Sequence, residues 1–151
     1  MGLYDHTQRG WLHLLLAPIA IAGIAAGLAL VPDDPGAWIL VGVGALFGLL
    51  APCFAHLRVR DDGDALRLEF GPWRVFRRTV RYAEIEAAGP DRTALIDGWG
   101  IHYVPLRGWT WNIRGFRAVR IDLRSGGTLR VGTDDPDGLA AFLRTRIADP
   151  G

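Results

Sequence analysis

The sequence predicts an α+β membrane protein, in which an N-terminal transmembrane helical hairpin precedes an antiparallel β domain closed by a C-terminal helix. Two 23-residue stretches, 10–32 and 35–57, contain no Asp, Glu, Lys or Arg. The later sequence instead shows short segments of alternating apolar and polar residues, and then a helical apolar pattern near its end. This contrast excludes an ordinary soluble domain and divides the chain into residues 1–57 and residues 58–151.

The two uncharged stretches are each long enough to cross a membrane. At about 1.5 Å per helical residue each reaches about 35 Å, against about 30 Å for the hydrocarbon core of a bilayer. The first stretch is too long for the apolar part of a cleaved signal peptide, which is the main alternative. The connection at 31–36 is short and rich in Pro, Asp and Gly, so the two helices are expected to run antiparallel.

Charges flanking the spans predict the orientation of the hairpin. Arg9 precedes the first span, and Arg58 and Arg60 follow the second, so all three lie on one side of the membrane. Asp33 and Asp34 lie in the connection on the other side. By the positive-inside rule, both termini are expected in the cytoplasm.

Each span contains two glycines four residues apart. Such pairs allow membrane helices to approach closely. In a hairpin that turns between Asp33 and Asp34, Gly23 would lie opposite Gly44, which predicts packing within the hairpin. The abundance of glycine in membrane helices, or self-association into a homo-oligomer, would explain the same pattern. The four residues are Gly23, Gly27, Gly44 and Gly48.

The region after residue 60 is predicted to be antiparallel β structure. Strands are expected over 65–70, 73–80 and 82–88, and alternation over 119–123 followed by Ser125-Gly126-Gly127 predicts a hairpin with 128–131. Pro136 in a first turn and apolar residues spaced by three and four predict a final helix. These apolar residues are Leu139, Phe142, Leu143 and Ile147.

The order of several glycine- and tryptophan-rich pieces resembles a known family. The pieces are Gly98-Trp99-Gly100-Ile101-His102-Tyr103, Arg107-Gly108-Trp109-Thr110-Trp111-Asn112, Gly115, Ala118-Val119 and Gly132-Thr133-Asp134-Asp135-Pro136. The chain resembles bacterial membrane proteins that carry a pleckstrin-homology-like (PH-like) domain. This resemblance implies a bent, partly open β-barrel of about seven strands with a capping helix, and a role that is membrane-associated more often than catalytic. We expect the chain to lie in the inner membrane.

The acidic loop 61–64 departs from the basic cluster that the related eukaryotic domains use to bind inositol lipids. Attraction to anionic lipid is still expected from arginines near the second span, at about 1 kcal/mol for each arginine close to the surface. A solvated strand face would explain the same residues. The candidate membrane-surface arginines are Arg58, Arg60, Arg74, Arg77 and Arg78, with Arg81 next to them in the sequence.

Little in the sequence predicts catalysis. The one serine, Ser125, is in a predicted tight turn, and the one cysteine, Cys53, is in the second span. His13 and His56 would lie at similar depth, which allows haem ligation between the helices, but interfacial histidines are ordinary. Turn and capping chemistry accounts for the acidic clusters without calcium. We expect no enzyme activity, cofactor or metal, and the net charge of +1 is too small to indicate nucleic-acid binding.

The segment 99–117 is the candidate partner-binding site, because tryptophan and arginine dominate binding hot spots. The alternative is that the tryptophans fill the core of the β domain. The candidate residues are Trp99, Arg107, Trp109, Trp111, Arg114 and Arg117. The sequence thus predicts an interaction or scaffolding module that presents its domain to a protein partner. A small membrane-anchored enzyme, or an accessory subunit of one, is the alternative.

Overall fold

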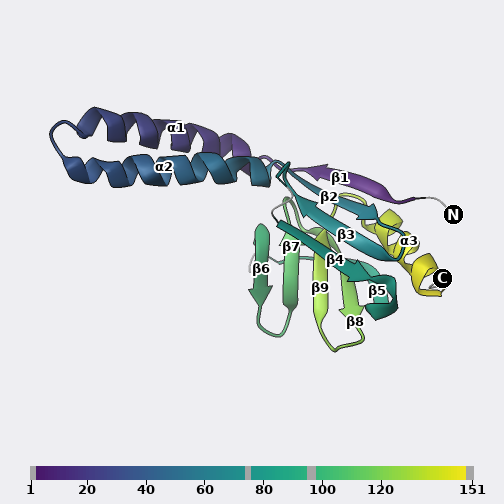
Figure 1. Cartoon of the computed structure of the whole chain (residues 1–151). Coiled ribbons are helices and arrows are strands. Elements are labelled where there is room, and N and C mark those ends of the chain that lie inside the picture. Colours follow the sequence, from purple (N-terminus) through teal and green to yellow (C-terminus); the bar gives the residue numbers. More distant parts are fainter. Residues whose placement is uncertain (1–2, 74–75, 95–97, 149–151) are drawn as a thin grey trace.

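The chain forms a long helical hairpin that projects from a β domain (Figure 1). The computed structural model describes residues 3–73, 76–94 and 98–148. Helix α1 (Leu12–Leu30) runs antiparallel to α2 (Trp38–Leu50). Short 3₁₀ turns, η1 (Pro35–Ala37) and η2 (Ala51–Phe54), flank α2. Two apolar helices followed by antiparallel strands and a last helix confirm the predicted α+β class.

Small residues form the contact between α1 and α2. A Cβ atom built on Gly23 would lie 3.5 Å from the Cα of Gly44, and one on Gly48 would lie 3.6 Å from the Cβ of Ala20. The backbone of α2 approaches more closely at Gly27, where a Cβ would lie 2.9 Å from the nitrogen of Val41. All four glycines singled out in the sequence therefore face the neighbouring helix.

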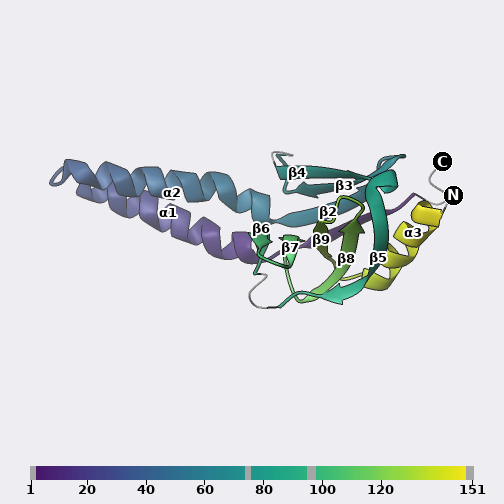
Figure 2. The same cartoon turned by 90° about the horizontal axis from the view of Figure 1, so that it is seen from below.

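The strands form two sheets, which do not close into a barrel (Figure 2). The first sheet is antiparallel, in the order β1 (Asp5–Arg9), β2 (His56–Asp61), β3 (Ala65–Phe70) and β4 (Phe76–Arg81). The second has the order β5 (Ile85–Arg92), β8 (Arg117–Leu123), β9 (Thr128–Gly132), β7 (Gly108–Asn112) and β6 (Gly100–Val104). Strands β7 and β9 pair in parallel, whereas the other neighbours are antiparallel.

The break between the sheets follows β4. A strand was expected over 82–88, but Tyr82–Glu84 forms a 3₁₀ turn, η3, before β5 begins. Tyr82 is buried, and its hydroxyl donates a hydrogen bond to Asp61 Oδ1 at 2.7 Å. This contact holds Tyr82 in the interior, so the chain turns from the first sheet into the second instead of extending through that position.

Strand β1 was not predicted from the sequence. Asp5–Arg9 lacks apolar alternation, yet it pairs with β2 in a register that places Thr7 opposite Arg58 and Arg9 opposite His56. Gln8 is buried and donates from Nε2 to the carbonyl of Arg114 at 3.2 Å. The N-terminal tail is therefore an edge strand of the β domain, and residues 56 and 57 belong to β2.

The core lies between the two sheets and the C-terminal helix α3 (Pro136–Ala148), which packs against β5 and β8. The helix begins as predicted, and Asp135 caps it by accepting a hydrogen bond from the backbone N–H of Gly138 at 3.1 Å. The buried residues include Leu57, Leu66, Leu68, Phe70, Ile85, Val119, Ile121, Leu129, Leu139 and Leu143. The predicted strand 65–70 and the hairpin 119–131 are confirmed and supply many of these side chains.

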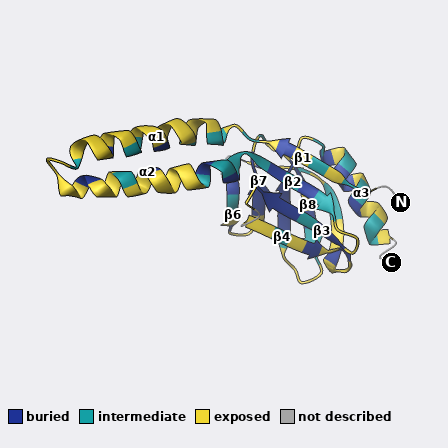
Figure 3. Ribbon diagram, turned by 45° about the horizontal axis from the view of Figure 1, so that its top comes forward, coloured by how far each residue is buried: buried dark blue, intermediate teal, exposed yellow. Residues whose placement is uncertain are grey.

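Most of the hairpin surface is exposed and apolar (Figure 3). Both Leu12–Leu30 and Pro35–Phe54 are long and apolar enough to cross a membrane by length and composition. Ala20, Gly27 and Gly44 are buried in the contact between the helices. The β domain contacts the hairpin at its base, so most leucine and isoleucine side chains of the hairpin are exposed in the part of the chain that the structure describes.

Candidate binding groove and hairpin-base pocket

A groove lies between β4 of the first sheet and the β6–β7 pair of the second. One hollow, of about 310 Å³, adjoins another of about 320 Å³, and both are lined by Arg78 and Trp109. We call the two hollows together the Arg78–Trp109 groove. Its other lining residues are Phe76, Arg77, Ile101 and Trp111 in the first hollow, and Tyr103, Leu106, Gly108, Leu123, Gly126, Gly127 and Thr128 in the second.

Arg78 points into this groove because of the register of β4. It lies opposite Leu68, which is fully buried, whereas Arg77 lies opposite Glu69 on the other face of the sheet. Cross-strand partners share a face, so Arg78 is on the core side. Arg77 and Arg78 are therefore on opposite faces of the sheet. Arg78 takes a core-side position, where the alternation of this strand would place an apolar residue, and it lies on the edge strand.

The Arg78 guanidinium is half-buried, and burial lowers its pKa from the ordinary value. Within the described part of the chain it makes no ion pair or hydrogen bond. Two exposed aromatic side chains, Trp109 and Tyr103, lie close by with ring centroids 5.7 Å apart. The groove therefore combines an uncompensated cation with apolar walls, an arrangement suited to a carboxylate flanked by apolar groups.

The structure does not gather the six predicted partner-binding residues on one surface. Trp109 lines the groove and is 42% exposed, whereas Trp111 is 5% exposed and packs on Phe70 in the core. Trp99 is at the hairpin base, with its ring 5.5 Å from that of Trp11. The three arginines lie elsewhere, Arg107 in the β6–β7 turn, Arg114 after β7 and Arg117 at the start of β8.

The predicted membrane-surface arginines are also divided. Arg58 is paired with Asp5 near the hairpin, and Arg60 lies 3.8 Å from the carboxylate of Glu69. Arg77 and Arg78 both line the groove, and Arg77 is the more exposed of the two. Arg74 is outside the described residues. Arg81 is at the end of β4 that lies opposite Ala65, away from the hairpin.

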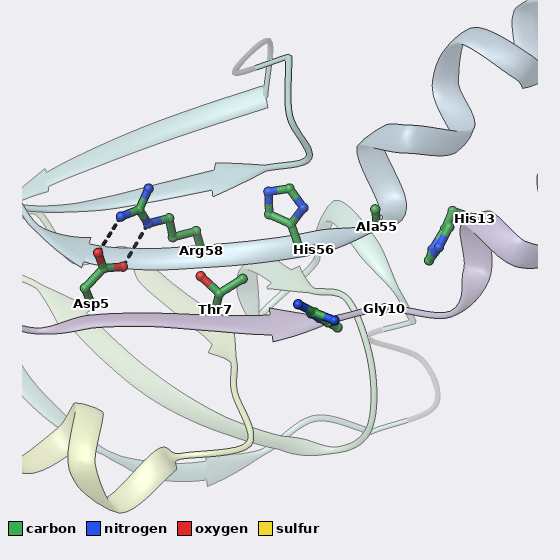
Figure 4. A pocket seen from close by; sticks show the side chains of 8 residues that line it. Asp5, Thr7, Gly10, His13, Ala55, His56 and Arg58 are labelled. Carbon is green, nitrogen blue, oxygen red and sulfur yellow. Dashed lines mark hydrogen bonds and ion pairs between the residues drawn. The ribbon is translucent and has the colours of Figure 1, made fainter.

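A second hollow, which we call the hairpin-base pocket, lies where the helices join the first sheet (Figure 4). It has a volume of about 660 Å³ and is lined by Asp5, Thr7, Arg9, Gly10, His13, Ala55, His56 and Arg58. Arg58 Nε donates to Asp5 Oδ1 at 2.8 Å, and this contact lowers the pKa of the Asp5 carboxyl. Arg9 is exposed and has no ion-pair partner among the residues described.

Sequence reasoning missed parts of both sites. Arg78 was assigned to the membrane surface, and Phe76 was not singled out. Tyr103 and Leu106 lie within the predicted segment 99–117 but were not among its candidate residues. The break in alternation at Arg77 and Arg78 was the available signal for the groove. The matched depth of His13 and His56 was the signal for the pocket, although Thr7 could be placed there only once β1 was known.

Comparison with protein-family models finds none that matches this chain, and comparison with curated proteins likewise finds no match. The class that the fold and the sites define is therefore a structural one: an apolar helical hairpin that carries a two-sheet β domain with an open groove.

Proposed function

We propose that this chain is a two-span membrane protein and that its β domain is a non-catalytic interaction module at the membrane surface. The exposed apolar surface around the hairpin is the observation that carries this proposal. Fully burying one large apolar side chain contributes about 1.5–3 kcal/mol. A hairpin that exposes many such side chains gains this free energy when lipid surrounds it.

The proposed orientation places both termini and the β domain in the cytoplasm. Arg9, Arg58 and Arg60 are at the domain end of the hairpin, and Asp33 and Asp34 are at its tip. This distribution is the one expected from the positive-inside rule for an inner-membrane protein. We also propose that the β domain is related to PH-like domains. Its predominantly antiparallel strands and C-terminal helix support this relation, whereas the parallel β7–β9 pair departs from it.

The Arg78–Trp109 groove is the proposed interaction site, and its partner is an extended protein segment with an acidic side chain. An acidic group would compensate the half-buried Arg78, and apolar neighbours in that segment would cover Trp109 and Tyr103. The unpaired edge of β4 could add hydrogen bonds to the same segment. This interaction needs no covalent chemistry from the chain.

Insertion and orientation can be tested with single cysteines in a Cys53→Ala background. If the chain is an integral membrane protein, it should remain in the membrane fraction after extraction with alkaline carbonate. A cysteine in place of Asp34 should react with a membrane-impermeant reagent in intact cells, and one in place of Arg124 should react only after lysis. Extraction by carbonate would contradict the proposed anchor, and the reverse labelling pattern would contradict the orientation.

The interaction site can be tested with a photo-crosslinking amino acid at residue 109 in native membranes. Phe116 is a matched control position, because it is 40% exposed and lies outside the groove. We expect a protein crosslink from position 109, none from position 116, and weaker crosslinking from position 109 when Arg78→Gln is added. Equal crosslinks from both positions, or no effect of Arg78→Gln, would contradict the proposed groove.

A further inference from the structure

The hairpin-base pocket has two cross-strand pairs of polar side chains on one wall. Thr7 lies opposite Arg58, and Arg9 lies opposite His56, so all four side chains project from the same face of the β1–β2 ladder. Figure 4 labels Thr7, His56 and Arg58 on this ladder. The residues between them in sequence, including Gln8 and Leu57, are buried on the opposite face. The pocket is therefore built on the polar outer face of the first sheet.

The other wall is the beginning of α1. His13 lines the pocket, and its Nδ1 atom is shielded from solvent and has no hydrogen-bond partner among the residues described. The N-cap residue Trp11 makes no side-chain capping hydrogen bond, and no acidic residue lies in the first turn. The first backbone N–H groups of a helix lack partners within the helix, and they favour an anion. Gly10 and His13 line this wall, so the start of α1 adjoins the same hollow as the arginines.

The basic side chains of the pocket also outnumber its acidic ones. Asp5 is its one acidic lining residue, and Arg58 already binds this carboxylate. Arg9 has no such counter-charge within the described structure. An anion in the pocket could therefore pair with Arg9 without displacing the contact between Asp5 and Arg58.

We propose that the hairpin-base pocket binds the phosphodiester headgroup of an anionic phospholipid. This inference rests on the membrane insertion proposed above. The 19 residues of α1 extend about 28 Å, close to the thickness of the hydrocarbon core. The first residue of α1 would then lie at the boundary where lipid phosphates lie. A volume of about 660 Å³ gives room for a headgroup in addition to its phosphate.

Gly10 allows the chain to form this pocket. A Cβ at Gly10 would lie 2.6 Å from the carbonyl oxygen of Phe54 and 2.6 Å from a side-chain carbon of Ile113. Its N–H donates to the carbonyl of Ala55 at 2.9 Å. The strand-to-helix junction is thus held close to the end of η2, which keeps His13 beside the β1–β2 ladder.

The test is native mass spectrometry of the full chain in mild detergent, with phosphatidylglycerol and phosphatidylcholine of identical acyl chains. We expect preferential retention of phosphatidylglycerol. Arg9→Gln should reduce this retention about fivefold, the factor that corresponds to about 1 kcal/mol for one arginine at a membrane surface. His13→Phe should also reduce it, because the ring volume remains while the nitrogen atoms are lost.

Arg81→Gln is the matched control, since Arg81 is an exposed strand arginine at the far end of β4. It should retain phosphatidylglycerol like the unmodified chain. Equal retention of the two lipids, or equal losses in Arg9→Gln and Arg81→Gln, would overturn the proposed site. Displacement of phosphatidylglycerol by millimolar inorganic phosphate would also overturn it, because the ligand would then be free phosphate. A chain that inserts into membranes but shows no lipid preference contradicts this inference alone, whereas a chain that fails to insert contradicts the proposed function.

Discussion

Gly44 on α2 lies directly against the backbone of α1 at Ala20. A Cβ atom on Gly44 would be 2.9 Å from the carbonyl oxygen of Ala20 and 2.9 Å from the backbone nitrogen of Ile24. Backbone atoms cannot rotate away as a flexible side chain can. The contact between the helices at this point therefore depends on the absence of a side chain at residue 44.

The first prediction is that Gly44→Ala destabilises the hairpin by about 1–3 kcal/mol, the range for overpacking a tight contact. Gly42→Ala is the control, because a Cβ at residue 42 would meet nothing within 4 Å. The measurement is thermal unfolding in mild detergent followed by far-ultraviolet circular dichroism. Equal midpoints for Gly44→Ala and Gly42→Ala would show that the helices do not approach so closely.

The second prediction separates the two tryptophans of β7. Trp111 is in the core and packs on Phe70, so Trp111→Ala should cost about 3–5 kcal/mol of stability. Trp109 is in the groove, so Trp109→Ala should preserve the fold and weaken partner crosslinking from other groove positions. Unfolding midpoints and crosslinking yields test both expectations. A Trp109→Ala chain that unfolds as readily as Trp111→Ala would assign Trp109 to the core instead.

The third prediction concerns the ion pair between Asp61 and Arg146, which connects the end of β2 to α3. The Asp61 side chain has no exposed surface, and it also accepts hydrogen bonds from Tyr82 and from the backbone of Gly63. Asp61→Asn should cost about 3 kcal/mol, since it leaves Arg146 without its counter-charge in a largely buried site. The exposed Asp64→Asn should change little. Comparable thermal midpoints for the two variants would refute this role.

The fourth prediction is a loss of stability at alkaline pH that depends on Tyr82. Burial, followed by the hydrogen bond to Asp61, raises the pKa of Tyr82 above the ordinary value near 10. The unfolded chain releases this proton at lower pH than the folded chain does, so stability falls as pH rises above about 10.

Tyr82→Phe tests this dependence. It should lower stability by about 1 kcal/mol at neutral pH through the lost hydrogen bond. The difference in unfolding free energy between Tyr82→Phe and the unmodified chain should then shrink between pH 9 and pH 11. Burial also raises the pKa of Tyr4, so Tyr4 lowers the stability of the unmodified chain and of Tyr82→Phe alike as the pH rises. The measurement is unfolding by denaturant across this pH range, and a constant gap would contradict the prediction.

The elements that could be predicted from sequence have a local apolar period. Strand β3, the β8–β9 hairpin and α3 each carry such a period within their own residues, and the two helices of the hairpin are predicted by their uncharged stretches. Strand β1 lacks such a pattern and forms because β2 offers an unpaired backbone edge. Tyr82 and Glu84 continue a strand-like pattern in sequence, yet the buried hydrogen bond to Asp61 turns the chain there.

The sequence by itself determined that an apolar hairpin precedes a β domain, because charge and apolar period depend only on neighbouring residues. Only the tertiary structure decided what the individual arginines and tryptophans do. The β3–β4 register places Arg78 on the core side. Packing separates Trp109 from Trp111, and pairing of the N-terminal tail brings Thr7 and Arg9 to His56. Each of these positions depends on a partner distant in sequence, so the period of the local sequence cannot specify it.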